Sequence, residues 1–291
     1  AGQWRFQLDR QDAGIKARWF DQRLPNTIRL PGSLPEQGIG DPVTVDTKWT
    51  GGIVDKSWFT APEYEKYRQP GNVKLPFWLQ PEKYYAGVAW YQHDVEIPKA
   101  WEGKRTVLFL ERPHWETRVW LDGRPMGTNN SLATPHEYDL GQLAPGKHTV
   151  SIRVDNSMVI DVGENSHCVS DHTQGNWNGV VGTIELRATP LVWIEELQVH
   201  PNVATRSLML KGRIGNISGR PGKGDVDFYQ LTTAVSQGSL TNISVFWFQT
   251  GGVFAVDLPF NRYIRSWDEF APSRSEISVR LVQEGTDRRT T

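Results

Sequence analysis

The chain has 291 residues with 32 basic and 33 acidic side chains, and its formal net charge is −1. This balance excludes the basic stripe of a nucleic-acid-binding surface and the basic face of a membrane-surface helix. No apolar run approaches the roughly 18 residues of a membrane-spanning helix, and the length suits two domains better than one.

The first half contains clear strand patterns. Residues 106–110 form a short apolar run, and residues 117–121 alternate before Asp122-Gly123, a strong hairpin signal. Residues 146–154 alternate polar and apolar side chains. The pattern predicts a strand with Val150, Ile152 and Val154 toward the core, and with Ser151 and Arg153 facing outward.

Two stretches lack this rhythm of strands and turns. Residues 20–89 are rich in Pro, Gly and Trp, and residues 155–182 are dense in short polar side chains. Long loops inside compact domains are uncommon and are usually functional. The second stretch is therefore where we expect a site.

The pattern changes near Pro190, which interrupts the strands. New strands are expected at residues 192–194, 197–199, 208–214, 225–231, 243–248, 253–258 and 277–282. Some seven short strands with frequent turns are typical of an immunoglobulin-like sandwich, although the Cys…Trp…Cys signature is absent. The sequence predicts an all-β protein with domains at residues 1–190 and 191–291.

Several motifs resemble those of glycoside hydrolase family 2, the family of β-galactosidases, β-glucuronidases and β-mannosidases. The resemblance runs through the chain in order. It is carried by residues 4–9 (WRFQLD), 87–91 (GVAWY), 95–98 (VEIP), 118–123 (RVWLDG) with Gly127, 137–140 (EYDL), 146–156 (GKHTVSIRVDN), 178–186 (NGVVGTIEL) and 192–199 (VWIEELQV).

The resemblance implies a jelly-roll sugar-binding-type domain and then an immunoglobulin-like domain. A catalytic TIM barrel would follow beyond Thr291. It further implies an exo-acting, retaining, β-galactosidase-like enzyme located outside the cytoplasm. Thr183 or a neighbour stands where the family usually has Arg, and residues 274–277 replace its usual Leu-Tyr-x-Leu pattern. The subfamily therefore stays open.

Catalytic and metal-binding signals are weak within the chain. Retaining glycosidases need two carboxylates about 5–5.5 Å apart, and the family supplies them from its barrel. Glu164-Asn165 reverses the order of the family's Asn-Glu-Pro motif, and no Gly-x-Ser-x-Gly nucleophile elbow occurs. His167, Cys168, Asp171 and His172 match no known zinc module. We expect no catalytic residue, metal or cofactor here.

The best candidate for substrate binding is the loop at residues 171–178. Carboxylates and carboxamides form paired hydrogen bonds with sugar hydroxyls, and an indole offers a stacking face. In relatives, a loop at this place reaches the mouth of the barrel; a purely structural loop is the alternative. The candidate residues are Asp171, His172, Gln174, Asn176, Trp177 and Asn178.

Two functions stay open. In the first, the chain is the non-catalytic front region of a β-glycosidase, with a glycan substrate and the barrel of the same protein as partners. In the second, it is a free-standing carbohydrate-binding or surface-attachment protein. Neither reading requires nucleic acid or a membrane span, and both allow an oligomer.

Overall fold

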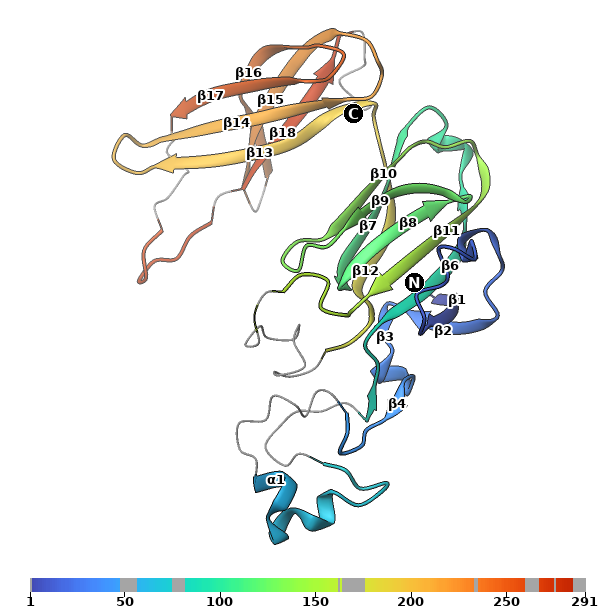
Figure 1. Ribbon diagram of the computed structural model, residues 1–291. Coiled ribbons are helices and arrows are strands. Elements are labelled where there is room, and N and C mark those ends of the chain that lie inside the picture. Colours follow the sequence, from blue (N-terminus) through green and yellow to red (C-terminus); the bar gives the residue numbers. More distant parts are fainter. Residues whose placement is uncertain are drawn as a thin grey trace. The chain divides into compact units, whose positions relative to one another are not determined.

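The computed structural model describes residues 2–47, 57–74, 82–161, 163, 176–232, 235–259, 267–274 and 276–284. These residues form an all-β protein, as the sequence predicts (Figure 1). They divide into a first unit, residues 1–102 with 106–188, and a second unit, residues 103–105 with 189–291. No helix among them is long and apolar enough to cross a membrane.

The first unit is a sandwich of two main sheets. One has the order β2-β1-β6-β11-β8-β9 and the other β10-β7-β12-β3. The strands are β1 (Gly2–Asp9), β2 (Asn26–Leu30), β3 (Gly32–Ser33), β6 (Val88–Ile97), β7 (Arg105–His114), β8 (Glu116–Leu121), β9 (Arg124–Asn129), β10 (His136–Gln142), β11 (Gly146–Asp155) and β12 (Gly179–Thr189).

The core between these sheets follows from side-chain alternation. Val150, Ile152 and Val154 of β11 enter it, as predicted, and Leu108 and Leu110 of β7 meet them from the other sheet. The hairpin between β8 and β9 also forms as predicted. Asp122 and Gly123 both have positive φ, at 49° and 77°, as a type I′ turn requires.

The outer face of the larger sheet is covered, which the sequence pattern did not indicate. Ser151 and Arg153 do point away from the core, yet both are buried. A second apolar cluster, which we call the tryptophan cluster, lies on this face. Its buried members are Phe20, Leu24, Val88, Trp90 and Trp120, with Ile15 and Trp19 packed against them.

Residues 20–89 contribute short elements in place of long strands. Besides β2 and β3, the described elements are the 3-10 helices Trp19–Asp21, Pro35–Gln37 and Pro62–Tyr67, the helix α1 (Ser57–Thr60), and the two-stranded sheet of β4 (Asp41–Pro42) and β5 (Lys83–Tyr84). A further 3-10 helix spans Lys99–Trp101. Trp58 of α1 is fully buried and donates from Nε1 to the Lys74 carbonyl oxygen at 2.8 Å, so this segment has a small core of its own.

The second unit has two three-stranded sheets, β13-β14-β17 and β16-β15-β18. Its strands are β13 (Val192–Asn202), β14 (Ser207–Asn216), β15 (Gly222–Thr232), β16 (Val235–Trp247), β17 (Gly252–Pro259) and β18 (Glu276–Gln283). The two strands expected at residues 192–194 and 197–199 are one strand, because a register shift between Ile194 and Glu196 lets pairing with β14 continue.

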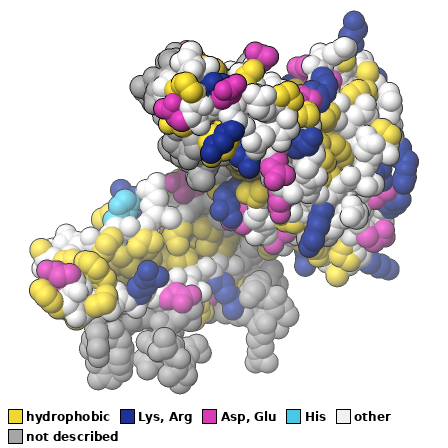
Figure 2. Space-filling model, turned by 90° about the horizontal axis from the view of Figure 1, so that it is seen from below, with side chains coloured by type: hydrophobic (Ala, Val, Ile, Leu, Met, Phe, Trp, Pro, Cys, Tyr) yellow, Lys and Arg dark blue, Asp and Glu magenta, His cyan; other side chains and the backbone are white. Residues whose placement is uncertain are grey.

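The core of the second unit is built around Leu210, Val226, Phe228 and Trp247. Its surface also carries large apolar side chains, including Phe246, Phe248 and Val253, and Phe248 is 74% exposed. Figure 2 shows hydrophobic side chains gathered on this unit.

Candidate functional site

The candidate loop joins β11 to β12, and the structure describes its final three residues. Asn176, Trp177 and Asn178 precede β12 directly. Asp171, His172 and Gln174 lie outside the described residues, as do Glu164, His167 and Cys168. The predicted sugar contacts of the loop therefore stay a prediction.

Asn178 is held inside the first unit and is only 1% exposed. Its Nδ2 donates to the carbonyl oxygens of Gly87 at 3.0 Å and Val154 at 3.1 Å. Its Oδ1 accepts the Tyr91 hydroxyl proton at 2.7 Å. Burial raises the pKa of Tyr91 well above its usual value, so this hydroxyl stays a neutral donor. The Asn178 side chain joins strands together in this structure.

Asn176 is bound in a reciprocal pair with Asn156, the residue that follows β11. Asn156 Nδ2 donates to Asn176 Oδ1 at 2.9 Å, and Asn176 Nδ2 donates to the Asn156 carbonyl oxygen at 3.0 Å. Both carboxamides are buried. The two asparagines of the candidate loop thus fix the backbone on either side of Trp177.

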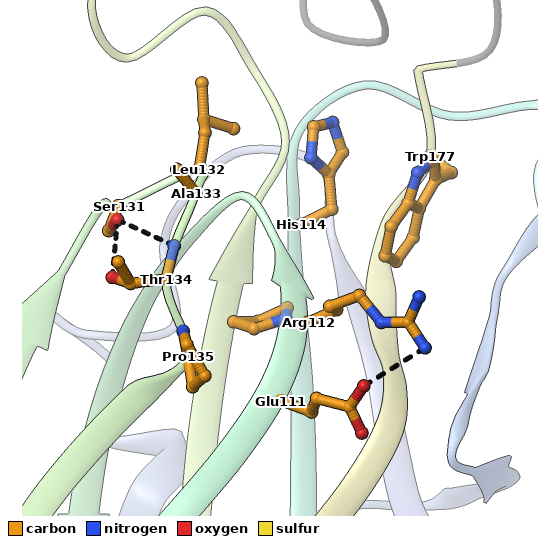
Figure 3. Close-up of a pocket in the computed structure, with 10 residues that line it drawn as sticks. Glu111, Arg112, His114, Ser131, Leu132, Ala133, Thr134, Pro135 and Trp177 are labelled. Carbon is orange, nitrogen blue, oxygen red and sulfur yellow. Dashed lines mark hydrogen bonds and ion pairs between the residues drawn. The ribbon is translucent and has the colours of Figure 1, made fainter. Parts of the chain in front are cut away.

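Trp177 faces a cavity of about 520 Å³. Its ring stacks on that of His114, with centroids 4.9 Å apart and planes inclined by 29°. The cavity is lined by Glu111, Arg112, Pro113, His114, Ser131, Leu132, Ala133, Thr134, Pro135 and Trp177. In Figure 3, Trp177 and residues 131–135 lie on opposite sides, and β7 residues lie between them.

The wall at residues 131–135 is held by a buried network. The Trp115 indole donates to the Asn130 carbonyl oxygen at 2.7 Å, and His136 Nε2 bonds to the Ser131 carbonyl oxygen at 2.9 Å. Because a carbonyl only accepts, Nε2 carries the proton, and Nδ1 accepts from Thr117 Oγ1 at 2.6 Å. Burial lowers the pKa of His136 below its usual value, so the ring is neutral near pH 7.

Glu111 and Arg112 supply the charges of the cavity. The Thr183 backbone N–H donates to Glu111 Oε2 at 2.7 Å, and Arg112 Nη2 lies 3.2 Å from Glu111 Oε1. The hydrogen bond from Thr183 is the main reason that the pKa of Glu111 falls below its usual value. The carboxylate is therefore ionised at neutral pH, and the cavity carries one charge of each sign.

Comparisons with known proteins connect this architecture with glycosidases. No family model matches the sequence. A β-glucuronidase from Paenibacillus borealis is 22% identical over 158 residues, which are 54% of this chain and 20% of that protein. The large subunit of a β-galactosidase from Leuconostoc lactis is 22% identical over 69% of this chain and 31% of that subunit.

Solved structures match nearly the whole chain. A crystal structure described as a putative β-galactosidase from Bacteroides fragilis has a TM-score of 0.67 at 13% identity, over 98% of this chain and 40% of the other. A glycosyl hydrolase family 2 member from Bacteroides cellulosilyticus has a TM-score of 0.62 at 16% identity, over 98% of this chain and 34% of the other.

The chain has the fold of the N-terminal region of glycoside hydrolase family 2 enzymes. The resemblance seen in the sequence motifs is thereby confirmed. The chain spans between 7% and 31% of the length of three curated relatives that it matches.

Within this family 2 fold, the cavity does not supply the chemistry of a retaining glycosidase. Its lining holds one carboxylate, that of Glu111, whereas that mechanism needs an acid and a nucleophile. Nor do three His, Cys, Asp or Glu side chains gather as a metal site within the part of the chain that the structure describes. The arrangement is suited to binding.

Sequence reasoning identified Trp177 but overlooked the other walls of this cavity. Glu111, Arg112 and His114 directly follow the apolar run at residues 106–110, and Ser131 and Thr134 follow the predicted hairpin. The sequence signal for this cavity was that polar residues end neighbouring strands at one sheet edge. What the sequence did not reveal is that β7 lies beside β12.

Proposed function

We propose that this chain is the non-catalytic N-terminal region of an exo-acting, retaining β-glycosidase of family 2. Its substrates are β-galactoside-like glycans, and its catalytic TIM barrel belongs to the same protein. The observation that carries the proposal is the fold similarity across 98% of this chain to a part, 34–40%, of larger glycosidases. The names of those relatives include both β-galactosidases and β-glucuronidases.

The geometry of the candidate loop supports a role at the entrance of the barrel. Asn176 and Asn178 anchor the end of the loop, while Trp177 between them reaches a cavity. An anchored end presents Trp177 with little loss of conformational entropy on binding, and the proposal assigns further sugar contacts to Asp171, His172 and Gln174. Pockets of exo-acting enzymes enclose a terminal sugar, and a barrel mouth is often completed by adjoining segments.

Kinetics of the enzyme with its barrel test the role of the loop. Asp171→Ala should lower kcat/KM by about tenfold or more, because a charged acceptor of a sugar hydroxyl is lost. Asn178→Ala should affect turnover less. Normal kcat/KM for Asp171→Ala in a correctly folded enzyme would remove the loop from the substrate site.

Two further measurements test where catalysis resides. Residues 1–291 alone should not hydrolyse aryl β-glycosides, and turnover by them would overturn the proposal. The reading frame beyond Thr291 should encode a barrel with two catalytic carboxylates. A stop codon there, together with micromolar glycan binding by the chain, would support the alternative of a free-standing carbohydrate-binding protein.

We also propose that the enzyme acts outside the cytoplasm, in the periplasm or as a secreted protein, as the family resemblance implies. Fractionation of the native cells with an antibody against this chain tests this location. Recovery of the protein only in the cytoplasmic fraction would contradict it.

A further inference from the structure

We propose that the cavity between Trp177 and residues 131–135 is a binding site for one neutral pyranose residue of a glycan. It is a subsite that this chain forms by itself, without a catalytic domain. The proposal rests on the proposed function only for the expectation that glycans are the ligands. The site is built from the described ends of β7, the β9–β10 connection and the residues before β12 (Figure 3).

The size of the cavity suits a small ligand such as one sugar residue. Its volume of about 520 Å³ lies within the range of roughly 300–1,000 Å³ that is typical of small-molecule sites. Leu132, Pro135 and Trp177 provide apolar surface, and a few polar side chains stand among them. Such sites combine apolar walls with a small number of placed polar groups, and a sugar ring requires both.

The indole of Trp177 is held in place before any ligand binds. Trp177 is stacked on His114 and lies between two buried asparagines, so neither its backbone nor its ring needs to be ordered by a ligand. An aromatic ring that is already ordered contributes contact area at low entropic cost. The apolar C–H face of a pyranose matches a flat ring of this kind.

The Glu111–Arg112 pair offers hydrogen-bonding groups to a sugar. Glu111 accepts hydrogen bonds from the backbone and side chain of Thr183 and pairs with Arg112, and a carboxylate with about four lone-pair sites can still accept a hydroxyl proton. The Arg112 side chain is 67% exposed, and its guanidinium has further N–H groups that can donate. An acceptor beside a donor, 3.2 Å apart, suits two adjacent sugar hydroxyls.

The same pair argues against anionic ligands. Arg112 is balanced by an ionised Glu111, and the His114 ring beside them is stacked on an indole. Phosphate and carboxylate groups favour sites with unbalanced positive charge. A neutral pyranose therefore fits the cavity better than a nucleotide or a uronic acid does.

The opposite wall is preorganised. Thr134 Oγ1 donates to Ser131 Oγ at 2.8 Å, and the Ser131 backbone N–H donates to Asn129 Oδ1 at 2.9 Å. Behind them, Trp115 and His136 bind the carbonyl oxygens of Asn130 and Ser131. A wall that is already ordered does not lose conformational freedom when a ligand enters.

Ligand-observed saturation-transfer NMR on the 291-residue chain tests the proposal. The probes are the methyl β-pyranosides of galactose, glucose and mannose, with methyl β-glucuronide as the anionic comparison. We expect millimolar binding of at least one neutral pyranoside and weaker binding of the glucuronide. If none of the neutral probes binds, or if only the glucuronide binds, the proposal is overturned.

Variants locate the binding. Ala133→Trp adds bulk to an exposed residue that lines the cavity and removes no contact between core side chains, so it should abolish binding while the protein stays folded. Trp177→Ala should raise the Kd about tenfold or more, and Glu111→Gln should weaken binding less. Trp267→Ala, which removes an exposed tryptophan of the second unit, should leave binding unchanged.

Unchanged binding in Ala133→Trp would overturn the proposal even if the Trp177 variant did not fold. This binding result can be distinguished from failure of the proposed function. Sugar binding is measured on this chain alone, whereas the proposed function is tested by turnover of the enzyme with its barrel.

Discussion

Two histidines of the first unit have pKa values that are shifted in opposite directions. Burial lowers the pKa of His136, while a hydrogen bond to Asp122 at 2.6 Å raises that of His148. Each shift links protonation to the free energy of unfolding, with opposite sign. These residues allow the electrostatics of the cavity wall to be tested without a ligand.

The stabilising contribution of His136 should be lost in acid. Below about pH 6.5 the unfolded chain binds a proton that the folded chain resists, so stability falls as the pH drops toward the lowered pKa. When the pH falls from 7.5 to 5.5, the free energy of unfolding should therefore decrease less in His136→Gln than in the wild type. Denaturant unfolding at several pH values measures this difference.

His148→Gln is the matched control. Its raised pKa contributes stability that is complete below about pH 6.5 and is lost as the pH rises through the folded-state value. When the pH falls from 7.5 to 5.5, the free energy of unfolding of His148→Gln should therefore decrease more than that of the wild type, opposite to His136→Gln. If the free energy of unfolding depends on pH equally in both variants, the assigned environments of His136 and His148 are contradicted.

Asn178→Ala should destabilise the protein by about 3 kcal/mol or more. The buried Tyr91 hydroxyl loses its acceptor and the carbonyl oxygens of Val154 and Gly87 each lose a donor, although the Asn156 N–H still donates to the Gly87 oxygen at 3.3 Å; each group left unpaired costs roughly 1–3 kcal/mol. Asn72→Ala is the control, since Asn72 makes an exposed bond to the Lys66 carbonyl oxygen that water can replace. Full stability of Asn178→Ala with reduced turnover would instead assign Asn178 to substrate binding.

At the scale of elements, the end of the candidate loop is fixed where β12 pairs with β3. Gly179 is opposite Ser33 in this pairing and has a φ of 149°, which L side chains rarely adopt. A Cβ at this position would lie 2.4 Å from the Gly32 carbonyl oxygen. The close approach of two backbones therefore positions residues 176–178.

Gly179→Ala should open this edge of the sheet and cost about 2–4 kcal/mol, because backbone strain and a steric clash add. Gly146→Ala is the control: Gly146 has a φ of 122°, but a Cβ added there would meet nothing within 4 Å, so only the strain remains. Thermal unfolding of both variants separates the two effects. An equal loss of stability in both variants would show that the backbone at Gly32 moves to accept the added Cβ without cost.

Elements with strict alternation were predictable, and elements whose partners are distant in sequence were not. The pattern at residues 146–154 correctly assigned the core side of β11. It could not indicate that residues 10–25 cover the opposite face, because burial of Ser151 and Arg153 depends on distant segments. The cavity was overlooked for the same reason, since its walls come from three separate segments.

At the scale of the whole molecule, each unit has its own hydrophobic core. Leu110 in the first core and Leu210 in the second are both fully buried. The all-β fold and the family resemblance were correctly inferred from motifs in chain order. The Asp171 end of the candidate loop lies outside the described residues, so its predicted role depends on the kinetic test above.

Leu110→Ala and Leu210→Ala should each cost about 2–5 kcal/mol through lost burial and a cavity. If the two cores unfold separately, calorimetry should show two transitions, and each variant should lower the midpoint of a different one. We expect this result because each leucine belongs to a separate core cluster. A single transition lowered equally by both variants would indicate one cooperative unit.

The tryptophan cluster gives the first unit an intrinsic optical label. The rings of Trp90 and Trp120 lie 4.9 Å apart and are inclined by 33°, and Trp19 meets Trp90 at 6.3 Å. Indoles this close couple their electronic transitions, and the coupling adds a signed pair of bands to the far-ultraviolet circular dichroism of the strands. The coupling of Trp19 with Trp90 ends when residues 10–25 leave the sheet, whereas the coupling of Trp90 with Trp120 lasts as long as β6 and β8 hold together, so one spectrum can separate the two events.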